Sequence, residues 1–117
     1  MQLDFAWSAQ GSLLVDATPR DEVIISFVGW DVGPDPDRAR ELRRQLAAAV
    51  AGGAQRSSGP HVVGRACAIT VHGSTAEIEN LVELFPVATY PVSTLLDALA
   101  QLEAWLVENL HRRPGYW

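Results

Sequence analysis

The sequence predicts one α+β domain over residues 1–117, with a mostly antiparallel sheet of five or six strands and two helices on one face, in the order βββ-α-ββ(β)-α. Three observations predict this class. Apolar and polar residues alternate strictly at the N-terminus, which is typical of a strand. Two later segments carry apolar residues every three to four positions, which is typical of a helix. These two segments follow runs of strands and do not separate every pair, so the sheet is expected to be antiparallel.

The N-terminal third of the chain is expected to form a three-stranded meander. Leu3, Phe5 and Trp7 alternate with polar or small residues, which is the period of a strand with one buried face. After a turn, the apolar stretch 13–15 begins a second strand. Residues 22–28 are almost continuously apolar and rich in β-branched side chains, which predicts a central strand buried on both faces.

The first helix is expected after a loop over residues 29–36. Asp35 is a good N-cap, and Pro36 suits the first helical position because its missing N–H has no partner there in any helix. Gly52 is expected to end the helix. The arginines of the outer face have no interleaved aromatic residues, so a solvated face is favoured over an RNA-binding one. The apolar stripe comprises Ala39, Leu42, Leu46, Ala49 and Val50, and the outer arginines are Arg40, Arg43 and Arg44.

Further strands are expected in the second half of the chain. Residues 62–72 predict a strand, and Gly73-Ser74 predicts a tight turn into another strand over residues 75–83. Residues 84–90 predict an additional strand. This strand belongs at an edge, because Pro86 has no N–H to donate to a central ladder.

The last helix is expected to begin near Thr94, which together with Asp97 resembles a capping box. Its end is expected at residues 111–113, where His and Arg side chains suit the negative end of a helix. The leucines that form its core stripe are Leu95, Leu99, Leu102, Leu106 and Leu110.

The charge distribution bears on possible partners. The net charge is −5, and residues 1–37 carry seven acidic side chains against one arginine, whereas residues 38–65 carry six arginines against one glutamate. A net negative chain repels phosphate and attracts basic proteins, so nucleic-acid binding is not expected. No segment reaches ~18 consecutive apolar residues and no signal-peptide pattern is visible, so the sequence predicts a cytoplasmic protein without membrane contact.

Two acidic groups are candidates for a partner-binding surface. Glu77 and Glu79 fall at alternate positions of one predicted strand, so they would share one face, and Glu83 would extend this acidic row if the strand continues past Leu81. Asp31 has no capping role to explain it, and it lies beside Trp30, a large aromatic residue of the kind that often anchors interfaces. A solvated strand face is the alternative for the glutamates, and packing against the first helix is the alternative for the tryptophan.

Candidates for catalysis are few. His72 is expected at a hairpin tip, and Cys67 is expected as a small buried residue in an apolar strand. No metal-ligand spacing, nucleophile motif or glycine-rich phosphate loop is present in the sequence. The sequence therefore predicts neither an enzyme nor a bound cofactor or metal ion.

The chain resembles the cytoplasmic immunity proteins of bacterial contact-dependent growth inhibition and related polymorphic toxin systems. The resemblance rests on the small α+β layout, on the acidic row and on residues 90–96, which lead into the last amphipathic helix. It implies stoichiometric binding of a cognate toxin domain, often a nuclease. A nuclease is basic because it holds phosphate, so an acidic inhibitor would imitate the charge of its substrate.

Two other functions stay open at this stage. The chain could bind or convert a small molecule in a pocket between sheet and helices near His72 and Cys67. It could instead be a structural subunit of a larger complex, with an exposed apolar patch around Trp7 or Trp117. The sequence leaves open the identity of the toxin and the oligomeric state.

Overall fold

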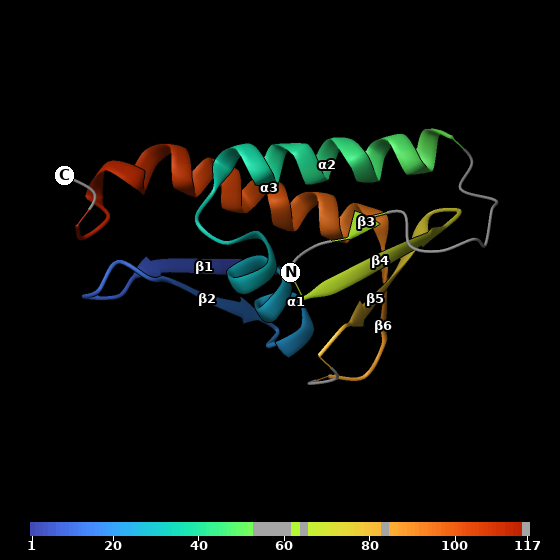
Figure 1. The fold of residues 1–117 in the computed structure, drawn as a ribbon, viewed down its shortest axis with the longest axis horizontal. Helices are drawn as coiled ribbons and strands as arrows, with labels where there is room; N and C mark the ends of the chain where they lie inside the picture. The colour runs from blue at the N-terminus through green and yellow to red at the C-terminus, as the bar shows by residue number, and fades with distance from the viewer. Residues whose placement is uncertain (53–61, 64–65, 83–84, 116–117) are drawn as a thin grey trace.

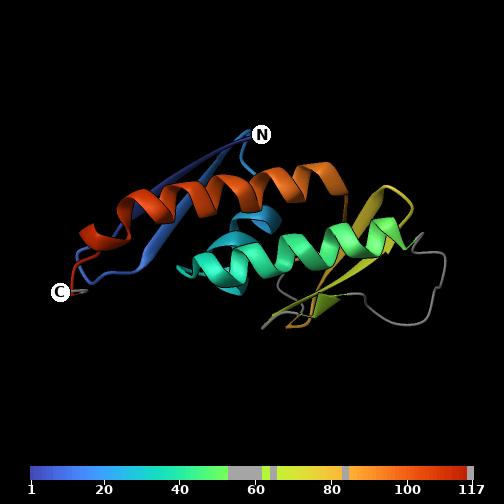
Figure 2. The same ribbon diagram turned by 90° about the horizontal axis from the view of Figure 1, so that it is seen from above.

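Two long antiparallel helices lie side by side over two small β-sheets (Figures 1 and 2). In this computed structural model, residues 1–52, 62–63, 66–82 and 85–115 are described. The helices are α2 (Pro36–Ala51) and α3 (Val92–Asn109). One sheet is the hairpin of β1 (Gln2–Trp7) and β2 (Leu13–Thr18), and the other has the antiparallel order β3-β4-β5-β6.

The β1–β2 hairpin is held to α3 by aromatic side chains. The inward residues of β1 follow the predicted alternation, with Leu3 buried and Phe5 packed against the core. The ring of Trp105 on α3 lies 5.6 Å from that of Phe5 and 5.1 Å from that of Trp7. The Trp7 indole N–H also donates a hydrogen bond to the carbonyl oxygen of Asn109 at 3.0 Å. Trp7 is therefore part of the hairpin's packing and not of an exposed patch.

The tip of this hairpin contacts the C-terminal turn of the chain. Arg113 Nε donates to the carbonyl oxygen of Gly11 at 2.8 Å, and its guanidinium group lies 5.4 Å from the centre of the Trp7 ring. Gly11 has a φ of 83°, and a Cβ atom there would lie 2.4 Å from the carbonyl oxygen of Pro114. Only glycine fits this close approach without strain.

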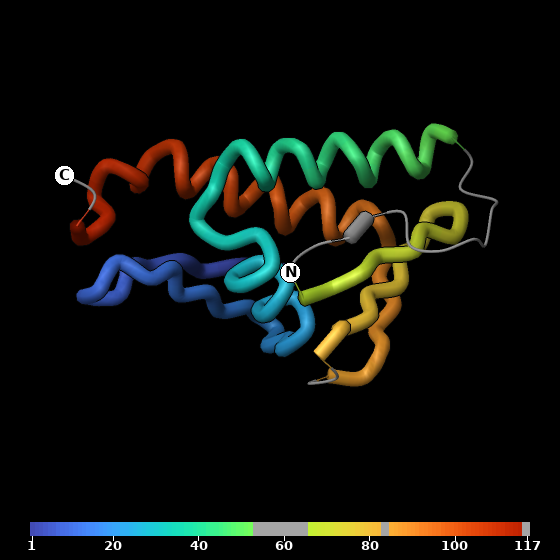
Figure 3. The backbone as a smooth tube through the Cα atoms, viewed as in Figure 1, coloured from blue at the N-terminus to red at the C-terminus, as the bar shows by residue number. Residues whose placement is uncertain are grey.

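The predicted third strand is wrong: residues 22–28 are helical. The chain forms a short helix α1 (Glu22–Ser26) that continues into one π-helical turn, η1 (Phe27–Val32), before it turns up into α2 (Figure 3). Asp21 caps α1, because its carboxylate accepts a hydrogen bond from the Ile24 N–H at 3.0 Å. The buried positions are Ile24, Phe27, Val28, Asp31 and Val32. Their spacing of three and four is that of a helix, and a short apolar run by itself does not separate a buried strand from a buried helix.

The predicted start of α2 is confirmed. The Asp35 side chain accepts from the backbone N–H groups of Asp37 and Arg38, both at 3.1 Å, and Pro36 occupies the first helical position. Gly52 follows the last turn, as expected. The buried face is narrower than predicted, because Val50 is exposed.

The second sheet lies under the N-terminal half of α3 and the C-terminal half of α2 (Figure 1). Its strands are β3 (Val62–Val63), β4 (Cys67–His72), β5 (Thr75–Asn80) and β6 (Ala88–Pro91). The predicted turn between β4 and β5 is confirmed, with Gly73 at a φ of 62°. The strand predicted over residues 84–90 is shorter, and as β6 it lies at the edge of the sheet as expected, while Pro86 precedes it.

Helix α3 begins two residues before the predicted cap at Thr94. Pro91 precedes it without a side-chain cap, and the N–H of Val92 donates to the carbonyl oxygen of Ser74 in the β4–β5 turn at 2.8 Å. This long-range hydrogen bond replaces the local cap. The core stripe of α3 is confirmed at Leu95, Leu99, Leu102 and Leu106, which are all buried. It is wrong at Leu110, which lies beyond the end of the helix and is only half-buried. A short 3-10 turn, η2 (Leu110–Arg112), follows the helix.

The α+β class is therefore correct, but the predicted single sheet of five or six strands with two helices on one face is wrong. The described strands form two separate sheets, and α1 with η1 lies between them in the chain. Tyr90 on β6 reaches across, and its hydroxyl donates to both carboxylate oxygens of Asp21 at 2.9 Å. Among the described residues, no helix combines the length and apolar character needed to cross a bilayer.

Candidate functional site

The outer face of the second sheet carries the two predicted glutamates that the structure describes. Along β5, Ala76 and Ile78 point into the core, so Glu77 and Glu79 point outward. The inner face of this sheet packs against α2 and α3, whereas these carboxylates lie on the opposite face. Glu83, the predicted third member of the row, lies outside the described residues.

The two glutamates have different surroundings. Glu77 lies opposite Thr70 on β4 and Thr89 on β6, and its carboxylate is 3.3 Å from Nε2 of His72, with both side chains about half exposed. Glu79 lies opposite Ala68 and is exposed. Within the part of the chain that the structure describes, no ion pair reaches Glu79. The two carboxylates therefore differ: Glu77 lies beside His72, whereas Glu79 is exposed on the outer face.

Asp31, expected on the partner-binding surface, is instead 1% exposed. One oxygen of its carboxylate accepts hydrogen bonds from the backbone N–H groups of Ala66, at 2.5 Å, and Cys67, at 3.1 Å. Its own carbonyl oxygen accepts from Arg38 Nε at 3.1 Å. Asp31 thus fixes the beginning of β4 against η1, because its carboxylate accepts hydrogen bonds from the backbone within the fold.

Trp30 remains a candidate, because 67% of it is exposed. It follows directly from the position of Asp31 that Trp30 lies near the start of β4. Cys67, the first residue of β4, pairs with Asn80, the neighbour of Glu79 in β5. The structure therefore brings Trp30 and Glu79 to the same end of the sheet, which the sequence order alone does not indicate.

Cys67 and His72 do not line a common pocket. They are five positions apart in β4, and an odd separation in a strand places side chains on opposite faces. Cys67 is buried on the inner face, whereas His72 is exposed on the outer face. Burial, and then the negative charge of Asp31, raise the pKa of the Cys67 thiol to about 11, although a hydrogen bond with Asn80 lowers it. The thiol is consequently protonated at neutral pH, unlike an activated nucleophile.

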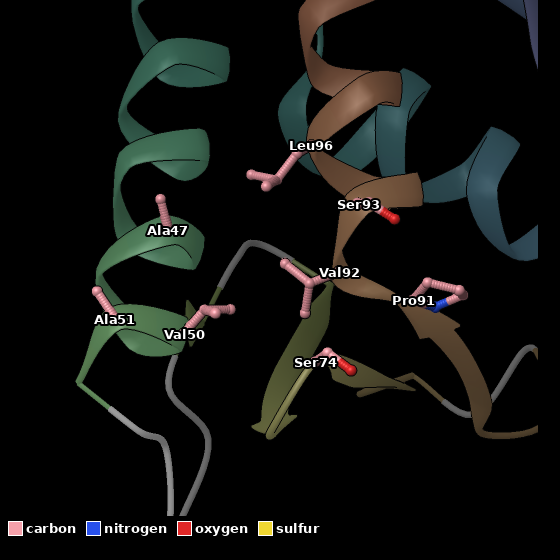
Figure 4. Close-up of a pocket in the computed structure, with 8 residues that line it drawn as sticks. All are labelled: Ala47, Val50, Ala51, Ser74, Pro91, Val92, Ser93 and Leu96. Carbon is pink, nitrogen blue, oxygen red and sulfur yellow. The ribbon is translucent and has the colours of Figure 1, made fainter.

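An apolar hollow that no sequence pattern indicated lies between the C-terminal end of α2 and the start of α3. It has a volume of about 490 Å³, and Figure 4 shows Val92 and Leu96 of α3 directed toward Ala47 and Val50 of α2. Among the described residues that line it, Ser74 and Ser93 supply the hydroxyl groups. The run of small apolar residues at the end of α2 is the available signal, but only Ala49 and Val50 of this run were interpreted, and both were placed in the core stripe.

No family model, no curated protein and no solved structure matches this chain. Within residues 1–52, 62–63, 66–82 and 85–115, no three His, Cys, Asp or Glu side chains gather closely enough to hold a metal ion. The candidate site therefore rests on its geometry: two outward carboxylates on the sheet face opposite α2 and α3, and an exposed tryptophan near the start of β4.

Proposed function

We propose that this chain binds and neutralises a basic toxin domain, of nuclease type, in the manner of a bacterial immunity protein. The observation that carries the proposal is the outward position of Glu77 and Glu79 on a sheet face that neither α2 nor α3 covers. A sheet face with carboxylates and threonines suits a cationic surface, because both side chains accept hydrogen bonds from Arg and Lys.

The proposed mechanism is occupation of the toxin's phosphate-binding surface, without turnover. A nuclease presents Arg and Lys side chains spaced to contact successive phosphates. Two residues along a strand lie about 7 Å apart, close to the separation of adjacent phosphates in a nucleic-acid strand, so Glu77 and Glu79 can meet neighbouring cations. Trp30 would add an apolar anchor at the end of this surface.

A small-molecule function that uses His72 and Cys67 together has less support, since the two side chains lie on opposite faces of β4. A structural role through a patch at Trp7 also has less support, because that ring packs on Trp105 and donates to Asn109. Trp117 lies outside the described residues.

The test uses the protein encoded beside this chain in its genome, where a large secreted protein with a variable C-terminal domain would supply the toxin domain. Titration calorimetry with that domain should give a one-to-one complex, and coexpression should restore growth. The Glu79→Lys variant should weaken binding at least about tenfold, because a like charge then faces the toxin's cations.

The matched control is Asp4→Lys, which makes the same charge change at another exposed strand carboxylate. It should leave the affinity within about twofold, since long-range attraction between exposed charges is screened beyond roughly 8–10 Å. Equal loss of affinity in both variants would show that only net charge matters. Unchanged affinity in Glu79→Lys, with an intact circular dichroism spectrum, would exclude this face.

A further inference from the structure

A continuous groove runs along the outer seam between α2 and α3. Three hollows, of about 490, 560 and 410 Å³, follow one another along it. The first two share Ala47 and Leu96 as lining residues, and the second and third share Arg43 and Ala100. The groove therefore extends over most of the length of both helices, and at its first hollow Ser74 and Pro91 of the second sheet also line it.

Helix α3 carries a second apolar stripe along this groove, separate from its core leucines. Leu96, Ala100, Ala104 and Val107 recur at spacings of four, four and three, which places them on one side of the helix. Val107 is 66% exposed. On α2, no charged residue occurs between Arg44 and the end of the helix. A solvent-facing helix surface is usually polar, so this stripe is suited to contact with another helix.

The two rims of the groove carry opposite charges. The α2 rim is basic and the α3 rim is acidic. Glu103 is already paired inside the chain, with Arg40 Nε at 3.1 Å and an Arg43 terminal nitrogen at 2.5 Å. Arg44 pairs with Glu41 on its own helix, and no ion pair joins Arg44 to Asp97 across the groove within the described part of the chain. The rims comprise Arg40, Arg43 and Arg44 on α2, and Asp97, Glu103 and Glu108 on α3.

We propose that this groove is the interface between two copies of this chain, related by a two-fold axis along the α2–α3 seam. Such an axis places α2 of one copy on α3 of the other at the same level along the helices. Arg40 and Arg43 stay paired with Glu103 inside each copy, and the contact between copies places Arg44 opposite Asp97 of the other copy. A peptide or helix of one charge sign would complement only one rim, whereas a second copy complements both.

The dimensions of the groove fit this occupant. At ~1.5 Å per residue, the 16 residues of α2 and the 18 of α3 make helices about 24 and 27 Å long. Two helices side by side, each about 10 Å wide, offer a face of the same order as the roughly 800 Å² per partner in a standard interface. The small side chains of Ala47, Ala100 and Ala104 allow the backbones to approach closely.

The first experiment measures the mass of the full chain by analytical ultracentrifugation from low micromolar to several hundred micromolar concentration. We expect a concentration-dependent dimer. Ala104→Glu and Val107→Glu place a charge in the apolar stripe and should raise the dimer dissociation constant at least about tenfold. Val87→Glu is the control, because Val87 is an equally exposed apolar residue in the β5–β6 connection. It should leave the constant unchanged.

The second experiment tests the two-fold arrangement itself. Arg44→Glu alone and Asp97→Arg alone should each be monomeric, because like charges then face each other twice. An equimolar mixture of the two variants should form a heterodimer, since both contacts are then between opposite charges. A folding defect would not be rescued by mixing, so this result separates an intermolecular contact from a structural role.

A chain that stays monomeric at every concentration would overturn the proposal. So would a dimer that neither groove variant weakens, or a mixture that remains monomeric. If the groove variants impair toxin binding while the wild type is monomeric, the groove accepts a partner's helix and not a second copy. The proposal does not depend on the toxin-binding function, because Glu77 and Glu79 lie on the far side of the sheet from this groove.

Discussion

Replacing Asp31 with alanine should destabilise the protein severely, although the residue is a single carboxylate in a short π-helical turn. Its side chain accepts two backbone hydrogen bonds, from Ala66 and Cys67, and almost no solvent reaches it. A hydrogen bond to a charged group contributes about 1.5–3 kcal/mol, and a buried donor left without an acceptor loses its solvation as well. We therefore expect the free energy of unfolding to fall by about 3–5 kcal/mol. A chain of 117 residues has roughly 6–17 kcal/mol of stability in total.

The assay is urea denaturation at neutral pH, followed by circular dichroism and by tryptophan fluorescence. Asp31→Asn keeps the shape and one acceptor oxygen, so it should lose only about 1–2 kcal/mol. Asp4→Ala removes an exposed carboxylate and should stay within about 0.5 kcal/mol of the wild type. A loss below about 1 kcal/mol in Asp31→Ala would refute the structural role assigned here. It would also return Asp31 to consideration as a surface residue.

Three further predictions concern contacts between distant parts of the chain. Tyr90→Phe removes a hydrogen bond to the capping carboxylate of α1 and should lower the free energy of unfolding by about 1–2 kcal/mol in urea denaturation at pH 7. A decrease under about 0.5 kcal/mol would contradict that contact. The folded-state pKa of Cys67 is raised to about 11, so the unfolded chain releases this proton first. The contribution of this thiol to stability should thus be present below pH ~8.5 and fall by about 2 kcal/mol by pH 10, and Cys67→Ala should lack this part of the fall. Gly11→Ala should lower the free energy of unfolding by about 2–3 kcal/mol, because its Cβ would collide with the carbonyl oxygen of Pro114. Gly73→Ala is also at positive φ but in open space, so it should lower it by only about 1 kcal/mol. Equal losses of the two variants in thermal melts would disprove the collision.

Local sequence patterns predicted only part of the candidate site. Alternation along β5 correctly placed Glu77 and Glu79 on one face, because the period of a strand depends only on its own backbone. Asp31 was expected at a partner-binding surface because no local capping role explained it. Its burial follows from a hydrogen bond to residues 35 and 36 positions later in the chain, and no local pattern reports a contact of that range.

Local sequence by itself determined α2, the core stripe of α3 and the β4–β5 turn. In each case, a capping side chain, a helical spacing of leucines or a glycine turn acts within a few residues. The tertiary structure decided whether residues 22–28 became a strand or a helix, because a short apolar run is compatible with either element when it is buried. It also decided that α3 begins at Val92, through the hydrogen bond to Ser74, and that the strands divide into two sheets. These outcomes depend on which buried surfaces meet, and their energy comes from contacts between segments far apart in sequence.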